Sequence, residues 1–145
     1  MNWKKISIER LSEYPARQRA VENLSERLKS LELSYASIKA ARTDGSPITG
    51  GGKGREDALI NNIVERQELK RNLRIVQHEV RITRRGLDSL TSEEKEVLFR
   101  FYIAQTSRHV EELCQRLNYE KTKIYVIKDR ALKNFTRACY GIVEL

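Results

Sequence analysis

The sequence predicts an all-α protein with two parts, a long helical hairpin over residues 1–86 and a small helix-turn-helix domain over residues 87–145. Three observations predict this class. Seven glycines and two prolines supply too few turn residues for an all-β fold. Apolar residues recur at the helical spacing of three and four over long stretches of the first part. After residue 87 the helical patterns become short, and capping and turn residues separate them.

A first long helix is expected from about Pro15, a residue that suits the first turn of a helix, to about Ala41. Apolar residues spaced three and four apart give this helix an a/d seam, the pattern of coiled-coil-like packing. The seam residues are Val21, Leu24, Leu28, Leu31, Tyr35 and Ile38.

Residues 43–54 hold five of the seven glycines and are expected to form a loop. Asp44-Gly45 and Ser46-Pro47 mark turns, and a cluster of glycines loses too much backbone entropy to be helical. No strand precedes the loop, and Arg55 follows Gly54 where a phosphate-binding loop has Lys. The composition therefore favours a flexible connector over a nucleotide-binding loop.

A second long helix is expected from about Arg55 to Gly86, which is expected to end it. Its seam continues through Leu69, Leu73, Val76, Val80 and Leu87, and Leu59, Ile60, Ile63 and Val64 form a broader apolar face. Two helices joined by a short loop favour an antiparallel hairpin. Because polar Asn62 and Arg66 interrupt the seam, pairing within one chain and a homo-oligomer through the N-terminal helices are both open. Arg81, Arg84 and Arg85 either complement the helix dipole or contact phosphates.

The second part predicts three short helices. Thr91 and Glu94 form a capping box at the start of the first helix, which ends near Ile103. Thr106 or Ser107 is expected to cap the second helix, and Asn118 is expected to end it in the left-handed conformation. A third helix starts near Lys121. The expected inward-facing residues are Val97, Leu98, Phe101, Tyr102, Val110, Leu113, Cys114, Leu117, Ile124, Ile127, Ala131, Leu132 and Phe135.

Two short helices joined by a tight turn are the arrangement of a helix-turn-helix, whose second helix enters the major groove of DNA. Lys121, Thr122 and Tyr125 are expected near base edges, and Lys123, Lys128 and Lys133 near phosphates. The alternative is an ordinary solvated helix face. Residues 118–140 carry a net charge of +4 from Lys121, Lys123, Lys128, Arg130, Lys133 and Arg137 against Glu120 and Asp129. The predicted DNA-binding residues are Lys121, Thr122, Lys123, Tyr125, Lys128, Arg130 and Lys133.

The whole chain has a net charge of +8, and residues 1–42 and 59–86 carry +4 each, so the total alone does not locate a binding site. No apolar run reaches the roughly 20 residues of a membrane span. Cys114 and Cys139 lie far apart, which fits a reduced, cytoplasmic protein. His109 and Cys114 have no further metal ligand nearby, and no nucleophile–base pattern is present. We therefore expect no metal, cofactor or catalytic residue, and no enzyme.

The second part resembles region 4 of the primary bacterial sigma factors. Val110 to Tyr119 matches the E-E-I-G-x-x-L-G turn of that region without gaps, and Arg130 to Phe135 matches its closing K/R-A-L-x-x-L. Leu90 to Tyr102 is similar to the helix that opens the region. Over roughly residues 20–140 the chain is similar to phage and prophage late-gene transcriptional regulators of the ArpU and RinA-like group. That group combines a helical N-terminal half, a Thr-Asp-Gly-x-Pro loop with glycines, here Thr43 to Pro47, and a sigma-region-4-like end.

This resemblance implies a regulator of phage late or lysis genes in a bacterial cytoplasm, acting at double-stranded promoter DNA with host RNA polymerase. Glu120 stands where sigma factors have a helix-capping Thr, and Tyr125 and Val126 stand where they have Arg and Gln. Recognition of the usual −35 element is therefore not expected. Because clustered aromatics of a melting region are absent upstream, a complete sigma factor is not expected either.

Two rival functions remain. A phage small-terminase-like DNA-packaging subunit also joins a helix-turn-helix to an oligomerising helical part. A protein-interaction module that binds RNA polymerase without DNA is the other rival, and acidic Glu93, Glu94 and Glu96 beside the basic helix support it.

Overall fold

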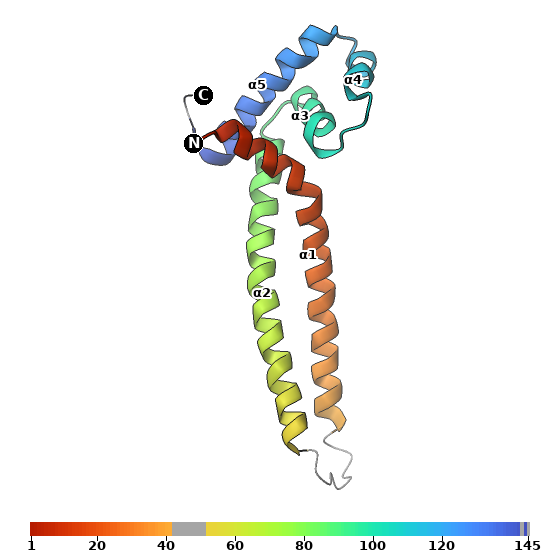
Figure 1. Ribbon diagram of the computed structural model, residues 1–145, viewed down its shortest axis with the longest axis vertical. Helices are drawn as coiled ribbons and strands as arrows, with labels where there is room; N and C mark the ends of the chain where they lie inside the picture. Colours follow the sequence, from red (N-terminus) through yellow and green to blue (C-terminus); the bar gives the residue numbers. More distant parts are fainter. Residues whose placement is uncertain (42–51, 143, 145) are drawn as a thin grey trace. The chain divides into compact units, whose positions relative to one another are not determined.

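The computed structural model describes residues 1–41, 52–142 and 144, and it confirms the all-α prediction. In chain order the elements are α1 (Trp3–Ala40), α2 (Gly52–Asp88), α3 (Ser92–Leu98), the π-helical segment η2 (Phe99–Ile103), α4 (His109–Leu117) and α5 (Lys121–Tyr140) (Figure 1). None of the helices in the described part of the chain is long and apolar enough to cross a membrane.

The chain divides into two compact units. Residues 19–77 form one, which we call the hairpin unit, and residues 1–18 with 78–145 form the other, which we call the head unit. The first 18 residues and the end of α2 thus group with the C-terminal helices. The sequence predicted a domain boundary between residues 86 and 87, and that boundary remains a prediction.

The hairpin unit consists of antiparallel stretches of α1 and α2 that lie side by side (Figure 1). Leu28 and Leu31 of the predicted seam are buried. Asn62 donates a hydrogen bond from Nδ2 to the carbonyl oxygen of Leu31 at 2.9 Å. Arg27 and Glu65 form an exposed ion pair of 2.8 Å across the two helices. The predicted pairing of the two helices within one chain is therefore present.

The expected start of the first helix at Pro15 is wrong, because α1 begins at Trp3. Asn2 caps it, since Oδ1 of Asn2 accepts a hydrogen bond from the backbone N–H of Lys5 at 3.1 Å. Proline inside a helix costs about 3 kcal/mol or more. Burial of Leu11 and Tyr14 in the head unit offsets this cost.

The glycine-rich loop was predicted over residues 43–54, but Gly52 to Gly54 belong to α2. The remaining residues, 43–51, lie outside the described part of the chain. Glycine is well tolerated at a helix N-terminus, where the backbone N–H groups have no intrahelical partner. A hydrogen bond of 2.6 Å from Nη2 of Arg55 to the carbonyl oxygen of Ile38 also ties the start of α2 to the end of α1.

Gly86 was expected to end the second helix, but α2 continues to Asp88. A Cβ atom at this position would lie 2.5 Å from Sγ of Cys139 and 2.8 Å from Cε2 of Phe135. Glycine therefore serves the close packing of α2 against α5. The thiol of Cys139 is enclosed at this contact, and burial raises its pKa to about 11.

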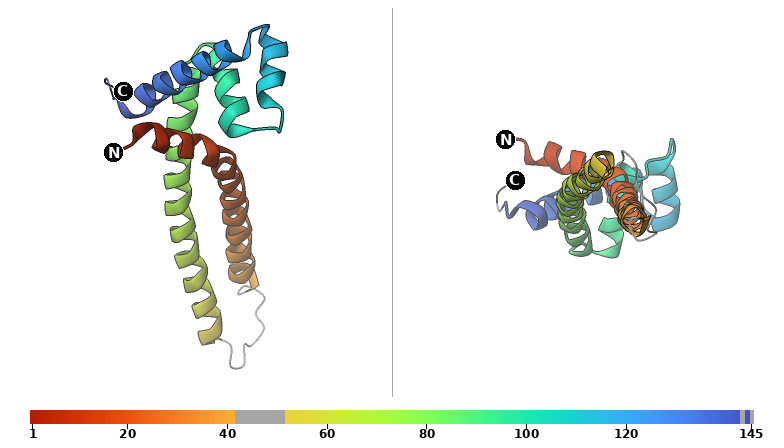
Figure 2. Two further views of the ribbon diagram at one scale, coloured as in Figure 1. Left: turned by 45° about the horizontal axis from the view of Figure 1, so that its top comes forward. Right: turned by 90° about the horizontal axis from the view of Figure 1, so that it is seen from below.

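The head unit contains the best-buried apolar side chains. Val97, Phe101, Leu113, Ile124 and Ile127 form a core in which α3, η2, α4 and α5 meet. At the other end of α5, its last turns lie beside the first turns of α1 (Figure 2). There the buried hydroxyls of Ser7 and Thr136 are 2.8 Å apart, and Nε of Arg10 donates to the hydroxyl of Tyr140 at 2.8 Å.

Candidate nucleic-acid interface

A tight turn joins α4 to α5. Asn118 ends α4 in the left-handed conformation, with φ of 59° and ψ of 44°, as predicted. Asparagine tolerates this region because its short polar side chain forms local hydrogen bonds. The backbone N–H of Tyr119 donates to the carbonyl oxygen of Cys114 at 3.2 Å, and α5 starts three residues after Asn118, at Lys121. The predicted turn and the predicted helix start are both confirmed.

The capping box of α3 is also confirmed. The backbone N–H of Glu94 donates to Oγ1 of Thr91 at 3.2 Å, and the backbone N–H of Thr91 donates to Oε1 of Glu94 at 3.3 Å. The second carboxylate oxygen accepts a hydrogen bond of 2.9 Å from Nδ2 of Asn134. Burial opposes the charge of Glu94, but the hydrogen bonds from Asn134 and Thr91 outweigh it and lower its pKa. Glu94 therefore ties the start of α3 to α5.

The predicted cap of α4 is wrong. Arg108 precedes the helix, and no side chain caps it. The hydroxyl of Thr106 instead donates to Oε2 of Glu112 at 3.1 Å, while the Thr106 carbonyl oxygen accepts from the backbone N–H of His109 at 3.3 Å. The side chain of Thr106 is thus engaged with α4 one turn farther along, and Ser107 does not replace it.

The inner face of α5 determines which side chains point away from the protein. Ile124, Ile127 and Ala131 have no exposed surface. Because an α-helix advances 100° per residue, the opposite face of the first two turns carries Thr122, Tyr125, Val126 and Asp129. All four are exposed. We call these four residues the outward face of α5.

The N-terminus of α5 carries two exposed lysines, Lys121 and Lys123, next to the exposed carboxylate of Glu120. Its first turn has no acidic residue, and the side chain of Glu120 makes no capping hydrogen bond. Lys121, Thr122 and Lys123 are exposed there. The first backbone N–H groups of a helix and its dipole both favour an anion at this end, and the two lysines add to that preference.

Tyr125 is held in place by an aromatic contact with η2. Its ring meets the ring of Phe101 edge-on, with centroids 5.7 Å apart. Nζ of Lys128 lies 5.5 Å from the centroid of Tyr125 and pairs with Asp129 at 3.1 Å. Nζ of Lys123 lies 5.8 Å from the ring centroid of Tyr119. These contacts orient two of the predicted phosphate-binding lysines beside aromatic rings.

Arg130 lies to one side of the outward face, whereas Lys133 lies on the same side of α5 as that face. The guanidinium of Arg130 pairs with Glu93 at 3.8 Å and with Glu94 at 3.6 Å, so it is directed toward α3. Lys133 is half-buried one turn beyond Asp129. The structure therefore brings Lys121, Thr122 and Tyr125 together on the first two turns, while Arg130 is engaged by carboxylates.

The residues chosen from the sequence omit two members of the outward face. Val126 is 53% exposed, and Asp129 is exposed as well. The predicted DNA-binding residues are all basic or polar, whereas Val126 is apolar and Asp129 is acidic. The helical period would have found both, since they lie opposite the predicted inner residues Ile124, Ile127 and Ala131.

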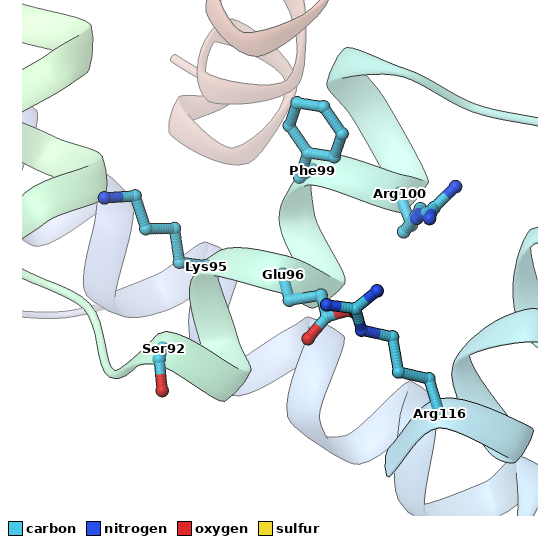
Figure 3. A pocket seen from close by; sticks show the side chains of 6 residues that line it. All are labelled: Ser92, Lys95, Glu96, Phe99, Arg100 and Arg116. Carbon is cyan, nitrogen blue, oxygen red and sulfur yellow. The ribbon is translucent and has the colours of Figure 1, made fainter.

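Side chains of α3, η2 and α4 enclose a pocket of about 410 Å³ (Figure 3). It is lined by Ser92, Lys95, Glu96, Phe99, Arg100 and Arg116. The side chains of Glu96 and Arg116 meet in an ion pair, and Arg100 pairs with Glu112 at 3.4 Å. Phe99 is 45% exposed and gives the pocket an apolar wall. Because acidic groups neutralise these two arginines, the pocket offers less positive charge than the two exposed lysines of the α5 N-terminus.

The fold is all-α, and a tight turn at Asn118 joins its last two helices. Comparison of the chain with protein-family models, curated proteins and solved structures finds no match. Within residues 1–41, 52–142 and 144, no three His, Cys, Asp or Glu side chains are placed to hold a metal ion.

Proposed function

We propose that the protein is a sequence-specific DNA-binding regulator of transcription. The observation that carries the proposal is the exposed, basic N-terminus of α5, which follows a tight turn and has its outward face open to solvent. The sequence resemblance supports action at promoters of phage or prophage late or lysis genes, together with host RNA polymerase, in the bacterial cytoplasm.

In this proposal the first two turns of α5 enter the major groove. Thr122 and Tyr125 hydrogen-bond to base edges, Val126 contacts a thymine methyl group, and Asp129 accepts a hydrogen bond from a cytosine amino group. Lys121, Lys123 and Lys128 bind phosphates and set the position of the helix. In each of these contacts the side chain meets a DNA group with which it can hydrogen-bond, pack or form an ion pair.

The salt dependence of DNA affinity tests the basic helix. Lys121→Ala with Lys123→Ala is expected to weaken binding and to reduce the slope of log affinity against log salt by about 0.9 for each phosphate that the variant no longer neutralises. Lys29→Ala with Lys39→Ala is the matched control, because both lysines are exposed on α1 in the hairpin unit and the change in net charge is equal. Equal effects of the two double variants would assign the binding to overall charge and reject the proposed interface.

The Phe99 pocket favours a second function, direct contact with RNA polymerase. An apolar wall among paired charges suits a peptide side chain better than a phosphate. Phe99→Ser should weaken binding to purified RNA polymerase in the absence of DNA and leave DNA affinity unchanged. Polymerase binding by this variant at wild-type strength would remove the support that the pocket gives.

A homo-oligomer through the N-terminal helices belongs to the same proposal, because it would give each particle two copies of α5. Arg81, Arg84 and Arg85 are exposed in the last turns of α2. Their contact with phosphates is a prediction that the same salt titration can test.

A further inference from the structure

The hairpin unit has a second apolar stripe on α2, on the side opposite its seam. The hydrogen bond from Asn62 to Leu31 shows which side of α2 faces α1. At 100° per residue, Ile60 and Val64 lie on the other side, with Ile63 at its edge. Ile60 is 57% exposed, Val64 47% and Ile63 37%. Three aliphatic residues at i, i+3 and i+4 thus form a continuous exposed patch rather than scattered single side chains.

Charged residues flank this patch with opposite signs. Glu56 and Asp57 lie before it on the same side of α2, and Arg71 and Arg74 lie after it. All four are exposed, and none forms an ion pair with another described residue. We call the surface made by these four residues with Ile60, Ile63 and Val64 the outer α2 face. Lys53 at its acidic end and Glu68 at its basic end reduce this polarity without reversing it.

We propose that the outer α2 face binds the same face of a second copy of this chain, with the two α2 helices antiparallel. A two-fold axis near residues 64–66 brings Ile63 and Val64 of both copies together at the centre and places Ile60 of each copy opposite residues 68–72 of the other. It also places Asp57 of each copy opposite residues 71–75 of the other, where Arg71, Arg74 and the exposed Ile75 lie. A parallel pair would instead set Glu56 and Asp57 against their own counterparts, which is unfavourable. The face is therefore complementary to itself in one orientation.

The same surface fits other occupants less well. Duplex DNA offers phosphates, which gain nothing from three aliphatic side chains and are repelled by Glu56 and Asp57. Helices that lie on anionic membrane surfaces carry basic residues along the polar face, whereas one end of this face is acidic. A two-fold contact between identical copies satisfies the apolar patch and both charged ends.

The mass of the full-length chain in solution, measured over a range of concentrations without DNA, tests this proposal independently of the proposed function. The wild type is expected to be a dimer. Ile60→Gln with Val64→Gln should raise its dissociation constant at least about tenfold. Glutamine is a good helix former, so circular dichroism should show unchanged helix content. Leu33→Gln is the control, because Leu33 is 74% exposed on α1 and outside the face, and this variant should stay dimeric.

Charge reversal adds a test of the flanking residues. Arg71→Glu with Arg74→Glu makes both ends acidic, and Glu56→Lys with Asp57→Lys makes both ends basic. Each double variant should be monomeric alone, and an equimolar mixture should form a heterodimer. A wild-type monomer at every concentration would overturn the proposal. A dimer whose dissociation constant is unchanged by Ile60→Gln with Val64→Gln would overturn it as well. A ring would also overturn it, because an isologous contact closes at two chains, and would favour the DNA-packaging rival.

Discussion

The head unit and the hairpin unit bury their side chains to different extents. Leu11, Val97 and Phe135 in the head unit have no exposed surface, whereas the best-buried seam residues of the hairpin unit, Leu28 and Leu31, keep 8% and 7%. Among the described residues, Oδ1 of Asn62 and Nε of Arg66 in the hairpin unit are buried without a hydrogen-bond partner, against Nη1 of Arg17 in the head unit. A two-helix seam cannot enclose its side chains as four or five packed segments can. We therefore expect most of the stability to come from the head unit.

The largest expected effect comes from the centre of the head unit. Phe135→Ala should lower the free energy of unfolding by about 3–5 kcal/mol, because it leaves a cavity where α5 packs against α2. Denaturant unfolding followed by circular dichroism measures this loss. Leu69→Ala is the comparison, since Leu69 is only half-buried in the hairpin seam, and it should cost about 1–2 kcal/mol. Equal losses at the two positions would contradict the difference between the units.

The close approach of α2 to α5 predicts the next effect. Gly86→Ala should destabilise by about 1–3 kcal/mol, because its Cβ would overlap Cys139 and Phe135. Gly54→Ala is the control, since no atom lies within 4 Å of its added Cβ. At that position alanine should be neutral or stabilise by up to about 1 kcal/mol. Similar behaviour of the two variants in thermal unfolding would show that Gly86 is not a packing residue.

Glu94 predicts a pH dependence of smaller size. Its pKa is lower in the folded chain, so its ionised form stabilises the fold above the pKa of the unfolded chain. This stability is lost as the pH falls through the lower, folded pKa. Glu94→Gln should cost about 1 kcal/mol at neutral pH and progressively less on acidification. Urea unfolding over a series of pH values measures this trend, and a constant difference between wild type and variant would contradict it.

The smallest effect is expected in the hairpin seam. Asn62→Leu should change the free energy of unfolding by less than about 1 kcal/mol, toward greater stability, because it removes a buried oxygen without a partner together with a single hydrogen bond. By contrast, Ser7→Ala in the head unit should destabilise by about 1 kcal/mol, since it breaks the buried hydrogen bond with Thr136. A higher free energy of unfolding for Asn62→Leu and a lower one for Ser7→Ala would support the difference between the two units. Equal losses of stability would contradict it.

Local signals made much of the head unit predictable. The capping box at Thr91, the left-handed Asn118 and the inner residues of α5 depend on neighbours within a few positions, and all were found. The start of α1 and the role of Gly86 were not, because they depend on distant contacts. Ser7 meets a residue 129 positions away, and Gly86 is in contact with side chains of α5.

Distant contacts also limited the prediction of the candidate interface. The sequence predicted that Lys121, Thr122 and Lys123 lie at an exposed helix start, because the turn before them depends only on neighbouring residues. It could not reveal that Arg130 pairs with Glu93 and Glu94, since those residues come from α3. A prediction based on charge also omitted Val126, because its side chain is apolar.

In the proposed function, the outward face of α5 reads base edges. Selection of bound sequences from a random DNA pool, with the wild type and with Thr122→Ala plus Val126→Ala, tests it most directly. The wild type should enrich one motif. The variant should lose the preference at one or two positions, about 1–3 kcal/mol for each base that is no longer read, and keep its salt dependence. A wild type that enriches no motif, or a variant that selects the same motif with the same stringency, would contradict the claim.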